Sequence, residues 1–352
     1  MIRSLVGAIL SVFLASSAIS AAAAPPFLLM WGTRGGEAGQ FGSTGGPRAA
    51  DVDQYGNVYV VDKPDGGATR VQVFDAEGRY SRQFPVAFDI GTTVDIALDA
   101  DGNIFLVNSI CSRVEKYDNL GGFLRMWGKG VNGGAGFEVC LSGCVCGSMG
   151  AVNGELNRPT ALGVDADGNV YVADTKNERI VKYSGQGVFD RTWGWDVAPG
   201  GGAGYEVCLS GCGVGLQGNG DGQFDDPVGI AVLENTVYVA DHYNYRVQLF
   251  SRTGSFQAAH MVNYPLGSVD VDRQGGFYFT VYTHDKVGHY DSSGVLIATW
   301  GSTGRGIGEF YAPSEVAVAP NGDVYIVDSL NYRLQKFGSP LMSFKAEPPD
   351  ID

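Results

Sequence analysis

The sequence predicts an all-β fold, a six-bladed β-propeller of four-stranded antiparallel blades. The first observation behind this prediction is a strand-turn-strand motif that recurs in six copies, whose second strands close on Asp62, Asn108, Asp174, Asp241, Val281 and Asp328. The second is the spacing of these positions, which are 46, 66, 67, 40 and 47 residues apart. A period in the forties, built from short strands, is typical of propeller blades.

The segment 159–194 shows what one repeat builds. Its β-branched and aromatic runs predict strands at about 160–164, 170–173, 180–183 and 188–193. Asp167-Gly168, between the first two runs, favours a tight hairpin because both central residues can take positive φ. One such blade cannot cover both of its faces, so neighbouring blades must stack into a ring.

A Trp-Gly pair predicts how the ring closes. Trp127, Trp193 and Trp300 end the fourth strand of their repeats, whereas Trp31-Gly32 precedes the first complete repeat and no Trp-Gly follows the last one. We therefore expect residues 27–31 to supply the outer strand of the last blade. Closure of this kind removes the exposed sheet edge of an open array.

The segments YVADTKNERIVKY, YVADHYNYRVQLF and YIVDSLNYRLQKF resemble the NHL repeat, and the resemblance extends over residues 27–337. Blades three, four and six keep both the Asp and the Asn-x-Arg of that repeat, and blade one keeps Asp62 and Arg70. Blade two has Asn108, Cys111 and Arg113, and blade five departs most, with Val281, His284 and Lys286. The resemblance implies a propeller but no particular activity, because propellers host unrelated functions.

The N-terminal residues predict export. Residues 1–24 hold one Arg, a short apolar run and small residues, which is the pattern of a secretory signal peptide. The propeller then occupies residues 25–338, and 339–352 form an acidic tail that we expect to be disordered. No further apolar run is long enough to span a membrane. We therefore expect a secreted, periplasmic or otherwise extracytoplasmic protein.

Charge narrows the range of partners. The formal net charge is −14, and no cluster of Lys and Arg is present to replace the counterions of a polyanion. We therefore expect no nucleic-acid partner. A protein or a small ligand remains open.

Two insertions, at 129–156 and 195–226, carry five of the six cysteines. Four of these lie within the related runs GGAGFEVCLSGC and GGAGYEVCLSGC, and Cys146 follows the first run. The repeated spacing predicts Cys140–Cys144 and Cys208–Cys212, which leaves Cys111 for Cys146. The alternative is Cys140–Cys146 with Cys111–Cys144. A zinc site fits poorly because neither insertion contains a His.

The candidate binding residues lie on loops that share a face with both insertions. They are Asp174, Arg179, Asp241, His242, Arg246, His284 and Asp285. The recurrence of Asp and Arg favours bracing of each loop by charge-assisted hydrogen bonds over catalysis, because a catalytic site occurs once. His284 and Asp285 stand out because the repeat pattern breaks there. Asp221, Asp225 and Asp226 are weak candidates for a metal site.

We therefore expect an exported propeller that acts as a binding or scaffold module through its loop face, without a cofactor. The alternative is a metal-dependent propeller enzyme, similar to lyases or lactonases, with a divalent metal in the axial channel. His260 and His289 fall away from the loop face, so too few histidines gather for a three-His metal site.

Overall fold

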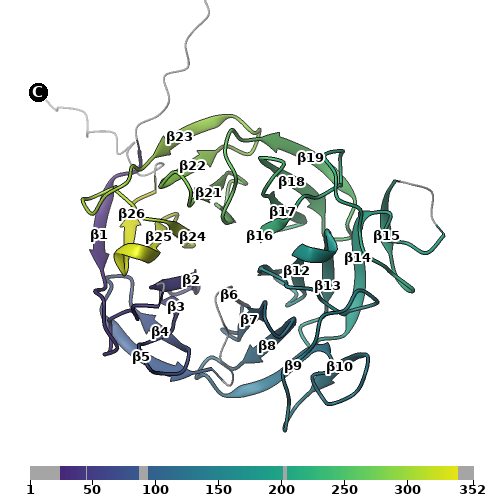
Figure 1. Ribbon diagram of the computed structural model, residues 1–352. Helices are drawn as coiled ribbons and strands as arrows, with labels where there is room; N and C mark the ends of the chain where they lie inside the picture. The colour runs from purple at the N-terminus through teal and green to yellow at the C-terminus, as the bar shows by residue number, and fades with distance from the viewer. Residues whose placement is uncertain (1–23, 45, 87–93, 201–203, 340–352) are drawn as a thin grey trace, which may run out of the picture.

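The computed structural model describes residues 24–44, 46–86, 94–200 and 204–339, which form six antiparallel sheets arranged as blades around a central channel (Figure 1). The predicted six-bladed all-β propeller is confirmed. The expected signal peptide and acidic tail fall almost wholly outside the described residues. Within those residues, no helix is long and apolar enough to span a membrane.

In blades one to five the strands follow chain order from the channel outward. Blade one holds β2 (Pro47–Val52), β3 (Val58–Asp62), β4 (Arg70–Phe74) and β5 (Tyr80–Pro85). Blade two holds β6 (Val94–Leu98), β7 (Ile104–Asn108), β8 (Arg113–Tyr117), β9 (Phe123–Lys129) and β10 (Phe137–Cys140). Blade three holds β11 (Ala161–Val164), β12 (Val170–Asp174), β13 (Arg179–Tyr183), β14 (Phe189–Trp195) and β15 (Tyr205–Cys208).

The second half of the ring has four strands in each blade. Blade four holds β16 (Pro227–Leu233), β17 (Thr236–Asp241), β18 (Arg246–Ser251) and β19 (Phe256–Met261). Blade five holds β20 (Val269–Val271), β21 (Phe277–Val281), β22 (Lys286–Tyr290) and β23 (Leu296–Trp300). Blade six holds β24 (Pro313–Val318), β25 (Val324–Asp328), β26 (Arg333–Phe337) and β1 (Phe27–Trp31).

Blades two and three correct the expectation of four strands per blade, because each has five. The fifth strands come from the insertions: β10 pairs with β9, and β15 pairs with β14. The insertions therefore do not only enlarge the loop face. Each begins as a hairpin that extends the sheet outward from the rim, as Figure 1 shows for β10 and β15.

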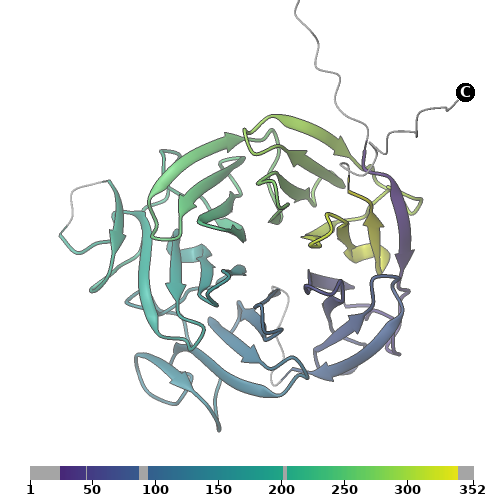
Figure 2. The same cartoon turned by 180° about the vertical axis from the view of Figure 1, so that it is seen from behind.

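Two faces of the disc can now be named. The loop face carries the loops between the second and third strands, including the 3₁₀ turns η1 (Thr175–Asn177) and η2 (Ser329–Asn331), and it faces the viewer in Figure 1. The hairpin face carries the turns between the first and second and between the third and fourth strands. It faces the viewer in Figure 2.

Each tryptophan of the Trp-Gly pairs packs against the next blade. Trp127 contacts Tyr183 with ring centroids 5.9 Å apart, and Trp193 lies 6.1 Å from Phe250. Both indoles are fully buried. A Cβ on Gly187, in the next blade's outer turn, would lie 2.8 Å from the Trp127 ring, so the indole needs a glycine there. At the interfaces that have a Trp-Gly pair, one indole therefore joins each blade to the next.

Ring closure follows the prediction. Trp31 pairs with Leu334 and Phe27 with Phe337, so β1 is the outer strand of blade six. The Trp31 ring then contacts Phe74 of blade one at 5.9 Å. The first strand of the described chain thus joins the last blade to the first.

Replacing Trp31 with Ala should lower the free energy of unfolding by about 2–3 kcal/mol, at or below the low end for a buried aromatic, because the ring is only partly buried. Leu28→Ala is the matched control, since that side chain is 48% exposed on the same strand and should cost less than about 1 kcal/mol. Urea unfolding followed by tryptophan fluorescence and circular dichroism measures both. Equal losses for the two variants would show that β1 does not hold the ring closed.

Candidate functional site

Four blades bury an Asp-Arg ion pair beneath the loop face. The Nε-to-carboxylate distances are 2.9 Å for Asp62–Arg70, 2.8 Å for Asp174–Arg179, 2.8 Å for Asp241–Arg246 and 2.7 Å for Asp328–Arg333. The remaining N–H groups of these four arginines donate mainly to backbone carbonyls of the segment that leads into the blade. Arg246, for example, donates to Asn219, Gly220 and Gln223. These pairs brace loops that have no strands of their own.

Blade two makes the same brace with its groups exchanged. Asn108 stands where the other blades have Asp, and Glu115 stands where Gln72, Gln248 and Gln335 stand in blades one, four and six. Arg113 turns to Glu115, with Nη2 2.6 Å from the carboxylate, and both side chains are fully buried. The amide and the carboxylate have changed places, so the charge balance of the buried pair is kept.

Asp285 belongs to a second kind of brace, a latch between neighbouring blades. It takes a left-handed backbone, with φ of 53°, just before the third strand, and its carboxylate accepts the backbone N–H of Ala312 at 2.7 Å. Glu178 does the same for Asp226, and the Ser112 hydroxyl does so for Arg158. The break in the repeat at Asp285 thus has a structural cause in the packing of blade five on blade six.

The structure therefore separates the seven candidate binding residues. Asp174, Arg179, Asp241 and Arg246 are buried in ion pairs, and Asp285 is 8% exposed within its latch. His284 is exposed, with its ring against Tyr264 at a centroid distance of 5.3 Å. His242 alone among the seven lines the pocket described next.

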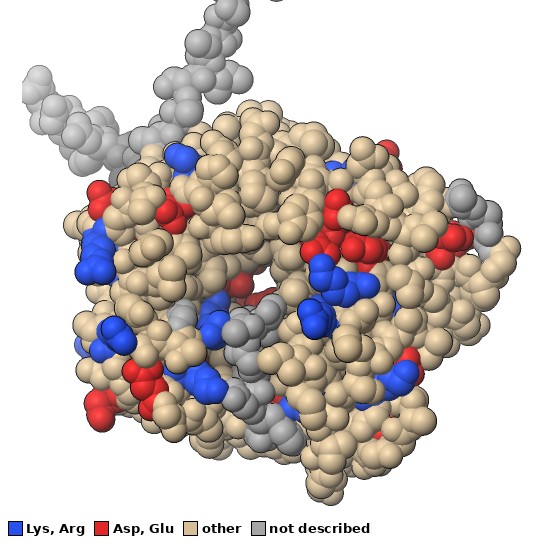
Figure 3. All heavy atoms as spheres, in the orientation of Figure 1, with Lys and Arg blue, Asp and Glu red and all other residues tan. Residues whose placement is uncertain are grey.

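A pocket of about 650 Å³ lies at the loop-face mouth of the channel, here called the mouth pocket. His242 and Tyr282 stack on its wall with ring centroids 6.0 Å apart, and Tyr243 and Leu330 reach its rim. The Nδ1 of His242 faces the carbonyl of Leu266, so Nδ1 carries the proton of the neutral ring and Nε2 is the basic nitrogen. Figure 3 shows the channel opening from this side, with acidic atoms visible inside it.

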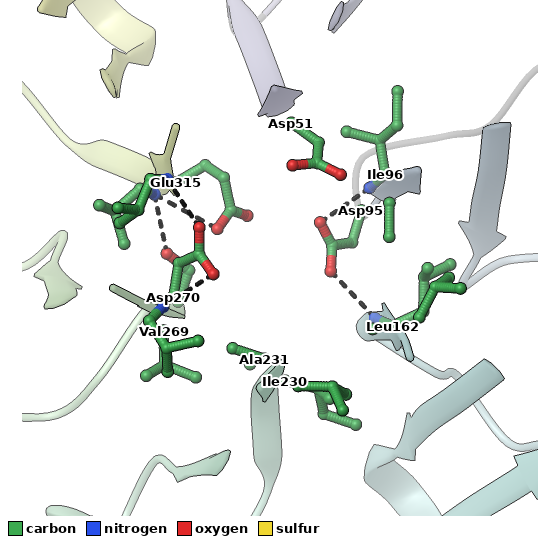
Figure 4. Close-up of a pocket in the computed structure, with 18 of the residues that line it drawn as sticks. Asp51, Asp95, Ile96, Leu162, Ile230, Ala231, Val269, Asp270 and Glu315 are labelled. Atoms are coloured by element: carbon green, nitrogen blue, oxygen red, sulfur yellow. Dashed lines mark hydrogen bonds between the residues drawn. The ribbon is translucent and has the colours of Figure 1, made fainter. Parts of the chain in front are cut away.

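Four carboxylates line the channel below the mouth: Asp51, Asp95, Asp270 and Glu315, in a cavity of about 250 Å³ (Figure 4). They come from the innermost strands of blades one, two, five and six. Blades three and four supply apolar groups such as Leu162 and Ile230 instead. One side of the channel wall is therefore acidic and the other apolar.

The channel carboxylates also tie neighbouring blades together. The inner edge of each innermost strand has backbone N–H groups without a partner strand. Asp51 accepts the N–H of Leu98 at 2.8 Å, Asp95 that of Leu162 at 2.9 Å, and Asp270 that of Val318 at 2.7 Å. Each of these three aspartates therefore satisfies an edge donor of the next blade, whereas Glu315 accepts the N–H of the adjacent Val316.

Burial raises the pKa of each channel acid. The pKa of Asp51 rises to about 6, that of Asp95 to about 7 and that of Asp270 to about 8, and Glu315 is raised well above its usual range. Repulsion adds to this effect, since Asp51 lies near both Asp95 and Asp270. Hydrogen bonds from backbone N–H groups act in the opposite direction.

The sequence analysis missed these four acids. A signal was available, because each carboxylate stands in the first strand of its repeat among small or apolar residues, as in AADV, VDIAL, SVDV and SEVAV. They occupy two levels: Asp51 and Asp270 lie opposite Tyr59 and Tyr278, whereas Asp95 and Glu315 lie opposite Val107 and Val327. Because the level differs between blades, alignment of the repeats does not place them in one column.

Of the weak metal candidates, Asp225 and Asp226 have other partners, and Asp221 is exposed. Asp226 pairs with Lys176 at 2.7 Å, and Asp225 accepts a hydrogen bond from Gln217. Among the described residues, no three His, Cys, Asp or Glu side chains gather closely enough to hold a metal ion. The four channel acids do not form such a group either.

The three predicted disulfides are confirmed. Cys111 bonds to Cys146, Cys140 to Cys144 and Cys208 to Cys212. The alternative connectivity is therefore wrong. Disulfides of this number indicate an oxidising, extracytoplasmic environment.

The insertions contact each other, and Arg179 lies beneath the contact. Its Nη1 donates to Ala151 of the first insertion at 2.6 Å and to Gly213 of the second at 2.5 Å. The N–H of Cys212 also donates to the Asn153 side chain at 2.8 Å. The predicted binding residue Arg179 thus organises a surface from below.

The two insertions also expose large apolar side chains. Eight large apolar side chains on the two insertions are between 37% and 61% exposed. They are Leu141, Val145, Met149 and Val152 on the first insertion and Val207, Leu209, Val214 and Leu216 on the second. We call these eight residues the insertion surface.

Comparison with known proteins agrees with the repeat analysis. The NHL repeat model matches residues 156–183, 224–250 and 310–337, which lie in blades three, four and six. The chain carries NHL repeats in a six-bladed propeller. These are the three blades that keep both the Asp and the Asn-x-Arg. No curated protein sequence matches significantly.

Solved structures with the same architecture include lyases. Streptogramin B lyase superposes with a TM-score of 0.56 at 13% identity, covering 84% of this chain and 93% of the other. A catalytically inactive variant of virginiamycin B lyase from Staphylococcus aureus, solved with quinupristin, gives 0.52 at 10% identity, covering 84% and 96%. At such identities the likeness concerns the fold alone.

Because the pKa values of the channel acids are raised, we expect this propeller to lose stability as the pH rises. The unfolded pKa of an Asp carboxyl is near 3.9. A carboxyl with a higher pKa in the folded protein binds its proton more tightly when the protein is folded. Its stabilising effect is complete below about pH 4 and is lost as the pH passes the folded values of about 6, 7 and 8. The melting temperature should therefore fall by several degrees between pH 5 and pH 8.5.

Asp270→Asn should flatten this dependence because it removes one of the titrating groups. The amide oxygen can still accept the N–H of Val318, so the contact between the blades is kept. Asp101→Asn, at an exposed turn of the hairpin face, is the control and should keep the parent slope. Calorimetry of the three proteins across the pH range measures the effect. Identical slopes in parent and Asp270→Asn would mean that the channel acid does not titrate as described.

Proposed function

We propose that this NHL propeller is an exported binding module that holds a partner protein against its insertion surface. The observation that carries this proposal is the exposure of the eight apolar side chains. Contiguous apolar patches on soluble proteins mark interaction sites, because such groups are otherwise kept from water. Their concentration on two adjacent insertions, in blades that would close without them, favours a role beyond folding.

The bracing of the insertions supports a preformed interface. Each insertion has a short disulfide, the first is also tied to blade two by Cys111–Cys146, and Arg179 joins the two. A surface that is already ordered loses less conformational entropy on association. The three disulfides also support export, for which the signal-like residues 1–24 are the expected route.

The test replaces two exposed leucines at equivalent positions. Leu141 and Leu209 occupy the related Cys-Leu-Ser-Gly-Cys loops and are each 61% exposed. Leu141→Ser with Leu209→Ser should weaken binding to a purified partner at least about tenfold, which corresponds to about 1.4 kcal/mol. The melting temperature should stay within a degree or two of the parent value.

Leu120→Ser is the matched control, because Leu120 is 74% exposed on a turn of the hairpin face. The partner is identified by comparing proteins captured by the parent, the double variant and this control, and is then titrated by calorimetry. A partner that binds the double variant and the parent equally would place the interface elsewhere.

A second function, catalysis at the mouth pocket, is favoured by one observation. His242 presents a basic Nε2 in a pocket that Glu315 also lines, and histidine and carboxyl side chains are common proton donors and acceptors in enzymes. No cluster of described residues is suited to hold the divalent metal of the lyase-like alternative. His242→Gln should abolish turnover of any substrate found while leaving partner binding intact, whereas unchanged turnover would exclude His242.

A further inference from the structure

Three blades hold a lysine ammonium in the same niche of the hairpin face. Lys116, Lys182 and Lys336 occupy equivalent positions in the third strands, each opposite an aromatic residue of the second strand. Each Nζ lies over that ring, at 4.6 Å from the centroid of Phe105, 5.2 Å from Tyr171 and 5.2 Å from Tyr325. This is the geometry of a cation-π contact.

The same three ammonium groups have polar partners as well. Lys116 lies 3.5 Å from Asp99 and Lys336 lies 2.8 Å from Asp323, both on the turn between the first two strands. Each also donates to a backbone carbonyl in the outer turn of the following blade: Lys116 to Gly185, Lys182 to Arg252 and Lys336 to Ala76. The niche is therefore an aromatic face with oxygen acceptors around it.

Blade five keeps the walls of this niche but lacks the ammonium. Tyr278 supplies the ring and Asp272 the carboxylate, but the lysine position holds His289. The imidazole lies flat on Tyr278, with centroids 3.9 Å apart and an interplanar angle of 6°. An imidazole is shorter than a lysine side chain, so it cannot fill the outer part of the niche.

Asp272 has also lost its amide partner. In blades one to three an Asn at the end of the turn donates its side-chain amide to the Asp, as Asn103 does to Asp99 at 2.8 Å. The equivalent residue in blade five is Gly276, and a Cβ there would lie 2.7 Å from Asp272 Oδ2 and 3.1 Å from His289 Nε2. A side chain at this position would collide with Asp272, so the glycine lets Asp272 and His289 lie close to the backbone of the turn.

The result is a cavity of about 180 Å³ with an unsatisfied group in its wall. It is lined by Asp272, Gly276, Tyr278, His289 and Asp291, among others. His289 is 7% exposed, and both ring nitrogens are buried without a hydrogen-bond partner, although Nε2 lies 3.4 Å from Asp272 Oδ2. A buried polar group of this kind needs a partner.

We propose that this cavity is a binding site for a primary alkylammonium group. The ligand's ammonium would lie in the cavity beside the stacked rings of His289 and Tyr278, donating to Asp272 and to one ring nitrogen of His289. The volume suits a short alkyl chain rather than a large ligand. The two carboxylates, Asp272 and Asp291, and the overall charge of −14 attract a cation.

The probe is n-butylammonium, which reproduces the end of a lysine side chain. Added to the full-length protein at pH 7.5, it should shift the imidazole C–H proton resonances of His289 with a millimolar dissociation constant. The four histidines are few enough to assign with a His289→Gln spectrum. n-Butanol, which has the same alkyl chain without the charge, should cause no comparable shift.

Two variants test the mechanism. Asp272→Asn should weaken binding at least tenfold and leave the melting temperature nearly unchanged. His289→Lys should restore the internal ammonium of blades two, three and six, so it should raise the melting temperature and abolish binding of the probe, followed by the Tyr278 ring resonances. Glu77→Gln, at an exposed turn of blade one, is the control that keeps parent affinity.

The source of the amine is separated by a second probe. Nα-acetyl-lysine methylamide carries the same ammonium on a peptide backbone, so binding of both probes indicates that a lysine side chain fits, and binding of n-butylammonium alone restricts the site to free amines. Equal shifts with n-butanol, no shift with either amine, or full binding by Asp272→Asn would overturn the proposal.

Discussion

The buried pairing of a carboxylate with an arginine is the interaction on which this ring depends. Each pair joins the end of a blade's second strand to the start of its third and to the segment that arrives from the blade before. Arginine suits the task because its planar group has five donors in a fixed arrangement. Arg246 uses them on one carboxylate and three carbonyls. A charge so fully paired can be buried, whereas the same charge alone could not.

The exceptions show that a blade does not need the same residues at these positions to be braced. Blade two exchanges the amide and the carboxylate and keeps the buried pair. Blade five has neither, with Val281, Lys286 and Gly288 at the three positions, and its innermost strand is the shortest of the six, Val269–Val271. The Phe279 ring lies where a side chain at Gly288 would be, so apolar packing replaces the brace there. The mouth pocket and the cavity beside His289 both involve this blade.

The repeat pattern was sufficient to predict the fold, the closing strand and the cysteine pairs. The blade motif occurs six times and the Cys-Leu-Ser-Gly-Cys spacing twice, whereas the closing strand and the Cys111–Cys146 pair were what remained once the repeats were assigned. The fifth strands were not predicted, since Phe137–Cys140 and Tyr205–Cys208 are four-residue strands within glycine-rich insertions that no other blade shares. The channel acids were missed because a single carboxylate within an apolar strand reads as an irregularity until the ring brings four together. The sequence placed His289 away from the loop face. Its significance depends on what the other blades hold at the equivalent position, and only the strand register shows that.

The way in which the ring closes has a mechanical consequence. Phe27 pairs with Phe337, so the two ends of the described propeller lie side by side at the same end of blade six. A force that pulls these ends apart would load the hydrogen bonds between β1 and β26 one after another, as a zip opens, and not all at once in shear. The bonds between the other strands would bear little load until β1 had peeled away. Under tension the propeller would therefore open at blade six, and its insertion surface, on the far side of the ring, would be the last part to be disturbed.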